Sequence, residues 1–173
     1  MPSIILIEND YPDKETMLKV LNYVFRSALI GGYALDPAHA FKQMCLVKRV
    51  FHKEGGVQLK HFIVSFTFRD MLRMDLDDVL KLGSWAGGVF CEYQMAYAVH
   101  TDSAHIHLHV VMNTVSFIDG HKYNKGRIGF FKLRAELQEL FPKSDVGLYW
   151  SDPRSRCSKF TYTENDYLLR IDR

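Results

Sequence analysis

Four of the eight histidines in this chain lie within ten residues of one another: His100, His105, His107 and His109. Between residues 104 and 115, polar or small side chains alternate with apolar ones, which is typical of a half-buried β-strand. Alternate residues of a strand share one face, so three of the imidazoles are expected on the same side. Neutral imidazoles ligate metal ions and transfer protons. The pattern therefore predicts a metal site on a strand, with open coordination positions.

The residues just before this strand extend the candidate site. His100 could supply a third ligand, and Asp102 stands beside it in the sequence. A lone histidine is more often a surface residue or a hydrogen-bonded core residue than a ligand. Four histidines in so short a stretch favour the metal or catalytic interpretation instead.

The composition indicates a single globular domain. The chain has 173 residues and is 47% hydrophobic, which is enough to bury a substantial core. No apolar run approaches the roughly 20 residues of a transmembrane helix, and the N-terminus lacks the basic segment of a signal peptide, so no membrane insertion is expected. The three cysteines (Cys45, Cys91 and Cys157) are too few and too far apart for a disulfide framework or a zinc–thiolate motif. We therefore expect a cytoplasmic protein.

The net charge of +2 is nearly neutral and favours neither a membrane-surface protein nor a strongly basic nucleic-acid binder. The positive charges are nevertheless grouped, in residues 42–60, 122–134 and 154–159. Each group alone is usually a solvated surface. Three groups around a metal site would also allow a track for a phosphate backbone.

Periodicity and turn residues predict the elements that must position the histidines. Strands are expected over residues 4–7, 57–67, 93–99 and 104–117, and helices over 13–26, 37–51, 75–90 and 130–140. Gly31-Gly32 is expected to break the chain and Asp119-Gly120 to form a hairpin-type turn, and no element is assigned after residue 143. The strands at 93–99 and 104–117 are joined too tightly for a parallel crossover, so they should be antiparallel neighbours. The predicted fold class is α+β, with a mainly antiparallel central sheet of about five strands flanked by helices.

The stretch from His100 to Asn113 resembles the third motif of the conjugative relaxases, the mobilisation nucleases of the HUH endonuclease superfamily. That motif reads roughly His-x-Asp-x-x-His-x-His-x-His-x-Val-x-Asn, and this chain has His-Thr-Asp-Ser-Ala-His-Ile-His-Leu-His-Val-Val-Met-Asn. Residues 60–66 resemble the second motif, His-x-x-x-Ser-Phe, and residues 20–24 resemble the first, which carries a tyrosine. The resemblance covers about residues 18 to 140. It implies an HUH relaxase-like domain over residues 1–145, with 146–173 as an extension of that domain or the start of a linker.

The resemblance implies a site- and strand-specific endonuclease that acts on single-stranded DNA at the transfer origin of a plasmid or mobile element. A tyrosine hydroxyl would attack one phosphodiester, leaving a 5′-phosphotyrosyl link and a free 3′ hydroxyl. The motif match assigns Tyr23 as the nucleophile, with Tyr11 and Tyr33 as the alternatives. A phenol, whose reference pKa is about 10, needs activation at neutral pH. Accessory DNA-binding proteins and coupling or secretion proteins are further partners that the resemblance implies.

The same resemblance assigns His100, His107 and His109 as ligands of a divalent metal ion that would polarise the scissile phosphate. Mn²⁺ or Mg²⁺ is the expected ion, and Zn²⁺ or Ni²⁺ is the alternative, because imidazole ligands do not choose among them. Asp102 would orient an imidazole or take the proton of the tyrosine. His105 shares the strand face of the ligands and could join or replace one of them.

Three further residues of the motifs have open roles. Ser65 could hold a DNA phosphate, and Asn113 could contact DNA or cap the end of its strand. For His61 the same two roles stay open, a DNA contact or a structural one. His39, His52 and His121 have no assigned role.

Two other functions use the same residues. A metal-dependent hydrolase would activate water with the three histidines and would not need a tyrosine. A non-catalytic DNA-binding domain would hold a structural metal ion and would not cleave DNA. Only the relaxase interpretation depends on the hydroxyl of Tyr23.

Overall fold

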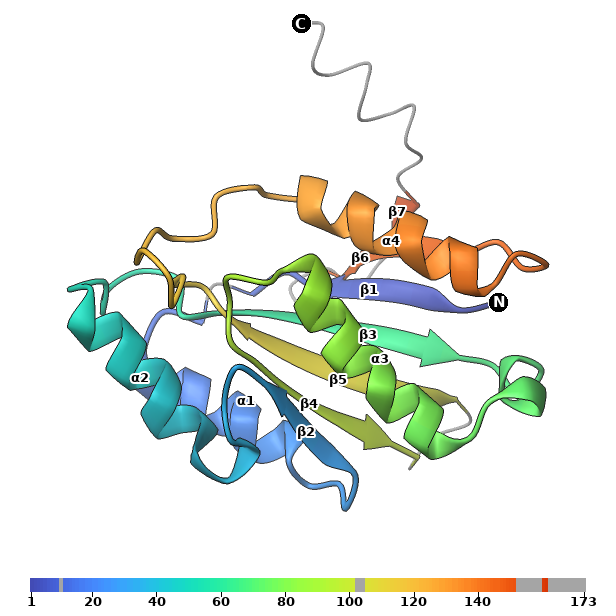
Figure 1. Ribbon diagram of the computed structural model, residues 1–173, viewed down its shortest axis with the longest axis horizontal. Helices are drawn as coiled ribbons and strands as arrows, with labels where there is room; N and C mark the ends of the chain where they lie inside the picture. Colours follow the sequence, from blue (N-terminus) through green and yellow to red (C-terminus); the bar gives the residue numbers. More distant parts are fainter. Residues whose placement is uncertain (10, 102–104, 152–159, 162–173) are drawn as a thin grey trace, which may run out of the picture.

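The computed structural model describes residues 1–9, 11–101, 105–151 and 160–161 (Figure 1). The strands are β1 (Ser3–Ile7), β2 (Ile30–Tyr33), β3 (Leu59–Phe66), β4 (Met95–His100), β5 (Ile106–Asn113), β6 (Gly147–Ser151) and β7 (Phe160–Thr161). The helices are α1 (Lys14–Val24), α2 (Ala40–Val50), α3 (Leu76–Val89) and α4 (Ile128–Leu140), with 3₁₀ turns at η1 (Pro37–His39) and η2 (Asp70–Arg73). None of the helices within the described ranges is long and apolar enough to cross a membrane.

The strands form one mixed sheet in the order β2-β4-β5-β3-β1-β6-β7. Among the described strands, β1 and β6 run parallel, and every other neighbouring pair is antiparallel. The predicted fold class, α+β with a mainly antiparallel sheet flanked by helices, is therefore confirmed. The sheet has seven strands rather than about five, because β2, β6 and β7 carry no alternating pattern long enough to be recognised.

Helices cover both faces of the sheet, α3 and α4 on one face and α1 and α2 on the other (Figure 1). Successive residues of β5 alternate between the faces, so Leu108 and Val110 pack in the core under α3 and α4. Val111 packs on the opposite side with α1 and α2. The strand therefore separates a large aromatic and aliphatic core from a smaller cluster, and the histidines lie on the side of the smaller cluster.

Side-chain caps explain where two helices begin. The carboxylate of Asp13 accepts a hydrogen bond from the backbone N–H of Thr16 at 2.8 Å, which starts α1 as predicted. Asp75 and Asp78 form a reciprocal capping box at the start of α3. The helix expected at residue 37 begins at Ala40 instead, because Asp36 caps a separate 3₁₀ turn.

The prediction that Gly31-Gly32 breaks the chain is wrong. Both glycines lie in β2, where Gly31 pairs with Tyr97 and Gly32 with Ala96 of β4. A Cβ on Gly31 would collide with the ring of Tyr97, and so would a Cβ on Gly83 of α3. These glycines therefore let the buried Tyr97 ring fit between the sheet and α3, where its hydroxyl contacts the hydroxyl of Ser84 at 2.6 Å.

The end of β5 is held by a buried polar network. Lys48 of α2 is fully buried, and its Nζ donates to the side-chain oxygen of Asn113 at 2.5 Å and to the carbonyl of Gln58 at 2.8 Å. The side-chain amide of Asn113 donates to Gln94 at 3.1 Å. The prediction that Asn113 contacts DNA is wrong, because the residue is 0% exposed, whereas its location at the end of β5 agrees with the alternative of a strand-end cap. Lys48 likewise does not belong to a solvated basic surface.

A comparison of two glycines of α3 tests the packing of Tyr97. We expect Gly83→Ala to lower the free energy of unfolding by about 1–3 kcal/mol, because the new methyl group must displace the Tyr97 ring. The space beside Gly88 is open, and a methyl group there would meet no described atom within 4 Å. Gly88→Ala should leave stability unchanged or raise it by about 0.5–1 kcal/mol. Urea unfolding of both variants measures the difference, and equal stabilities would contradict it.

The burial of Lys48 predicts a pH dependence of stability. Desolvation lowers the pKa of Lys48 from 10.5 to about 7, so above pH 7 the unfolded chain holds a proton that the folded chain has lost. The free energy of unfolding should therefore rise from about pH 7 to about pH 9, by at most about 1.4 kcal/mol per unit from this group. Urea unfolding at both pH values should show a smaller rise for Lys48→Met, and an unchanged rise for the exposed Lys42→Met.

Candidate active site

The histidines of the candidate site lie on two adjacent strands, at the end where β4 stops and β5 begins. His100 is the last residue of β4 and pairs directly with His107 of β5, while His109 pairs with Ala98. All three therefore project from the face of the sheet that carries α1 and α2. His105 is exposed and precedes the first residue of β5, and Asp102 lies outside the described residues.

The imidazole rings lie at unequal distances from one another. The ring centroids of His100 and His109 are 4.4 Å apart, and those of His107 and His109 are 6.2 Å apart. The ring of His105 is 6.3 Å from that of His107. In the part of the chain that the structure describes, no three His, Cys, Asp or Glu side chains form a group arranged to hold a metal ion. The structure thus brings His100 and His109 together most closely and leaves the other two rings farther out.

Tyr23 lies over this pair of rings. It is the penultimate residue of α1, its ring centroid is 5.5 Å from that of His100 and 5.5 Å from that of His109, and it is 43% exposed. The two alternative tyrosines lie differently. Tyr11 is only 3% exposed, and Tyr33 pairs with Met95 at the opposite end of β4. Of the three, only Tyr23 combines contact with the histidines and access from solvent.

The position of Tyr23 follows from how α1 is anchored on the sheet. Met17, Leu21 and Val24 of α1 are buried and pack in the smaller cluster with Ala96 and Ala98 of β4. The small alanine side chains let the helix approach the sheet closely.

The end of α1 is tied to the same strand by hydrogen bonds. The Nε2 of His100 donates to the carbonyl of Val24 at 2.8 Å, and the N–H of Val99 donates to the carbonyl of Leu29 at 3.0 Å. The first bond holds the last turn of α1, and with it Tyr23, beside the end of β4, and the second holds the segment that follows the helix.

His109 has a buried hydrogen-bond partner that the sequence did not reveal. Its Nδ1 lies 3.2 Å from the Nε2 of His61 on β3, and the Nδ1 of His61 lies 3.2 Å from the hydroxyl of Tyr11. Burial, with the neighbouring imidazoles, lowers the pKa of His109 to about 3, and burial lowers the pKa of His61 to about 4. Both rings are therefore neutral at pH 7, which is the form that ligates metal ions.

A cleft of about 410 Å³ opens beside Tyr23, between the last turn of α1 and the end of β4. Arg26 lines it together with Tyr23, His100 and Thr101. The guanidinium of Arg26 lies 5.9 Å from the centre of the Tyr23 ring and is exposed. No motif pointed to Arg26, and its place three residues after Tyr23, at the end of the helix predicted over residues 13–26, was the only sequence signal; in the structure α1 ends at Val24 and Arg26 lies in the turn that follows.

Ser65 lies beside this group as well. It pairs with His107 across β3 and β5, so its hydroxyl projects from the same face of the sheet as the histidines, and it is half-buried. Its assignment as a phosphate ligand stays a prediction.

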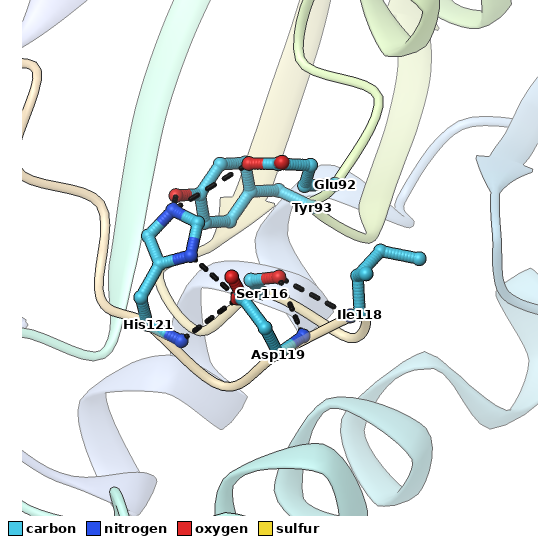
Figure 2. Close-up of polar contacts among 6 residues, drawn as sticks. All are labelled: Glu92, Tyr93, Ser116, Ile118, Asp119 and His121. Atoms are coloured by element: carbon cyan, nitrogen blue, oxygen red, sulfur yellow. Dashed lines mark hydrogen bonds and ion pairs between the residues drawn. The ribbon is translucent and has the colours of Figure 1, made fainter.

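A separate group of polar contacts surrounds His121, near Tyr93 and the Asp119-Gly120 turn (Figure 2). The Nε2 of His121 is 2.7 Å from the hydroxyl of Tyr93, and its Nδ1 is 2.5 Å from the carboxylate of Asp119. The hydroxyl of Ser116 accepts from the backbone N–H groups of Ile118 and Asp119. These contacts close the Asp119-Gly120 turn, where Gly120 has a φ of 75°, and they give His121 a structural role.

Known proteins resemble this chain in sequence and in fold. Residues 22–145 match the family model described as relaxase, MobA/VirD2-like, nuclease domain. Protein rlx of Staphylococcus aureus is 34% identical over 118 residues, which are 66% of this chain and 36% of that protein. The chain thus spans about a third of the length of this curated relative.

A solved structure supports the fold. The MobM relaxase domain (MOBV; Mob_Pre), bound to a 26-nucleotide pMV158 oriT DNA, matches with a TM-score of 0.54 and 11% sequence identity, over 96% of this chain and 98% of that one. At this identity the likeness concerns the fold alone. The family match covers most of the chain and includes Tyr23 and all four clustered histidines, which confirms the resemblance read from the motifs. The chain belongs to the family of MobA/VirD2-like relaxase nuclease domains.

Proposed function

We propose that this chain is a relaxase domain that nicks single-stranded DNA at a transfer origin, at one site and on one strand, through a 5′-phosphotyrosyl intermediate. One observation carries the proposal: the exposed Tyr23 lies against the rings of His100 and His109. The family match and the DNA bound to the MobM domain agree with it.

The reaction is a transesterification. The hydroxyl oxygen of Tyr23 forms a bond to the phosphorus of one phosphodiester, and the bond from that phosphorus to the 3′ oxygen breaks. The phenolic proton goes to a base, and the departing 3′ oxygen takes up a proton. One phosphodiester is exchanged for another, so the strand can be rejoined without an external source of energy. Asp102 is our candidate for the base, on sequence grounds alone, since it lies outside the described residues.

The donor set of the site fits a divalent metal ion. His100 uses Nε2 for the Val24 carbonyl, which leaves Nδ1 to coordinate, and His109 uses Nδ1 for His61, which leaves Nε2. We propose these two atoms and the imidazole of His107 as ligands, with His105 as a substitute for one of them; His107 would have to turn toward the closer pair. Mn²⁺ or Mg²⁺ is the proposed ion, and Zn²⁺ or Ni²⁺ is the alternative. When bound, such an ion neutralises charge on the scissile phosphate.

Arg26 supports binding of the DNA strand at this place. Its guanidinium is exposed at the cleft beside Tyr23, where it can pair with a phosphate oxygen. Ser65 could donate its hydroxyl to a phosphate from the other side of His107. We further propose a cytoplasmic location, and accessory DNA-binding and coupling or secretion proteins as partners of the whole protein.

The two other functions make different demands on Tyr23. A metal-dependent hydrolase needs only the histidines and water, and a non-catalytic DNA-binding domain needs no nucleophile. Neither accounts for a half-exposed tyrosine whose ring packs edge-on against two of the clustered histidines. This contact favours the relaxase.

Removal of one hydroxyl tests the nucleophile. We expect Tyr23→Phe to abolish the covalent adduct with a single-stranded oligonucleotide from the transfer origin, because no other tyrosine considered is both exposed and near the histidines. The oligonucleotide is labelled at its 3′ end, so that the label migrates with the protein on a denaturing gel. Tyr33→Phe, which removes a hydroxyl at the other end of β4, should form the adduct as wild type does.

The same assay separates the alternatives. A hydrolase would cut the 5′-labelled oligonucleotide in wild type and in Tyr23→Phe at equal rates, without an adduct. A non-catalytic domain would bind the strand and leave it intact with every divalent ion.

Removal of the metal ion tests the role of the histidines. We expect EDTA, or His109→Ala, to slow adduct formation by about 100-fold or more, because a bound divalent ion contributes several kcal/mol to phosphoryl transfer. Added Mn²⁺ should restore the EDTA-treated wild type but not His109→Ala. The exposed His39→Ala serves as the matched control and should react at the wild-type rate. Full activity in EDTA would exclude metal dependence.

A further inference from the structure

We propose that Tyr11 and His61 are positioning residues that select the tautomer of His109, and so determine whether its Nε2 presents a lone pair to the site. This inference rests on the proposed role of His109 as a metal ligand. Neither Tyr11 nor His61 would touch the DNA or the metal ion; they would act through His109.

The three side chains form a continuous buried line. The hydroxyl of Tyr11 is 3.2 Å from the Nδ1 of His61, and the Nε2 of His61 is 3.2 Å from the Nδ1 of His109. Tyr11 is 3% exposed, His61 8% and His109 4%. Water therefore has little access to these bonds, and each polar atom depends on its neighbour in the line.

The strands place the line at a fixed register. His61 of β3 pairs with Val111 of β5, and Ile63 pairs with His109, so the two histidines are diagonal neighbours on one face. Their ring centroids are 5.4 Å apart. Tyr11 enters from the connection between β1 and α1, and its backbone carbonyl accepts a hydrogen bond from Gln58 at 2.9 Å.

The backbone of Tyr11 is unusual. Its φ is 38°, in the left-handed region that a bulky residue rarely adopts. Such a conformation persists only where the surroundings hold it, and here the ring is buried in the smaller cluster while the hydroxyl reaches His61.

When both imidazoles are neutral, each ring has one N–H and one lone pair, so only two arrangements of the protons make both hydrogen bonds of the line. If Tyr11 donates to His61, then His61 donates to the Nδ1 of His109, and the proton of His109 sits on Nε2. That nitrogen cannot coordinate a metal ion.

In the second arrangement the direction of both bonds is reversed. His61 donates from Nδ1 to the oxygen of Tyr11 and accepts at Nε2 from the Nδ1–H of His109. The hydroxyl proton of Tyr11 then points away from His61. The Nε2 of His109 then carries a lone pair. Only this arrangement allows His109 to coordinate a metal ion. The oxygen of Tyr11, which is two side chains away along the line, therefore sets the tautomer of His109 by accepting a hydrogen bond.

Two variants test the line. His61→Ala removes the acceptor for His109, and the nearly isosteric Tyr11→Phe removes the acceptor for His61 while keeping the buried ring. We expect each to weaken Mn²⁺ binding, measured by calorimetry without DNA, by about 10–100-fold. His61→Gln, whose amide oxygen can accept from the Nδ1–H of His109 directly, should restore part of the affinity and make it insensitive to Tyr11→Phe. The exposed His39→Ala should bind as wild type does.

Nitrogen NMR of the metal-free protein supplies a second readout that does not involve catalysis. We expect His109 to be protonated on Nδ1 in wild type and to gain the Nε2–H tautomer in Tyr11→Phe. Folded Tyr11→Phe and His61→Ala proteins with unchanged Mn²⁺ affinity, or a wild-type His109 protonated on Nε2, would overturn the inference. If the tautomers shift as expected but wild type forms no DNA adduct, the positioning role stands and the proposed function fails.

Discussion

The antiparallel pairing of β4 with β5 is the interaction on which the rest of the site depends. It sets His100 opposite His107 and Ala98 opposite His109, so residues that are seven or more positions apart in the chain share one small area. The alternation of side chains then assigns Leu108 and Val110 to the large core and leaves the imidazoles on the other face. A shift of one residue in register would exchange the two sets, which makes the register costly to change.

The smaller cluster on the histidine face determines where the tyrosine lies. Ala96 and Ala98 leave room for α1, and the chain after α1 must reach β2, which pairs along β4. The helix therefore ends beside the last residue of β4, where His100 donates to the carbonyl of Val24. Helix α1 thus presents Tyr23 to the histidines. The side chain is half-exposed and within reach of a substrate from solution.

Several buried polar side chains of this domain lie in networks with specific partners. An unsatisfied buried donor or acceptor costs about 1–3 kcal/mol, so a buried polar side chain without a partner would weaken the fold. Lys48 and Asn113 form one network at the end of β5, and Tyr11, His61 and His109 form another beside its middle. The first holds the end of the strand, and the second lies behind a residue of the candidate site.

The sequence by itself determined the family, the α+β class and the cluster of histidines, because motif spacing and alternation are local properties of the chain. It also pointed to Tyr23, although Tyr11 and Tyr33 remained open. Only the tertiary structure separated the three, since exposure and distance to the histidines depend on how α1 and β2 pack on β4. The tertiary structure also decided three further points, because each depends on a residue far away in the chain. Gly31 belongs to a strand because it pairs with Tyr97, and Lys48 is buried where it meets Asn113. His61 contacts His109 because β3 pairs with β5.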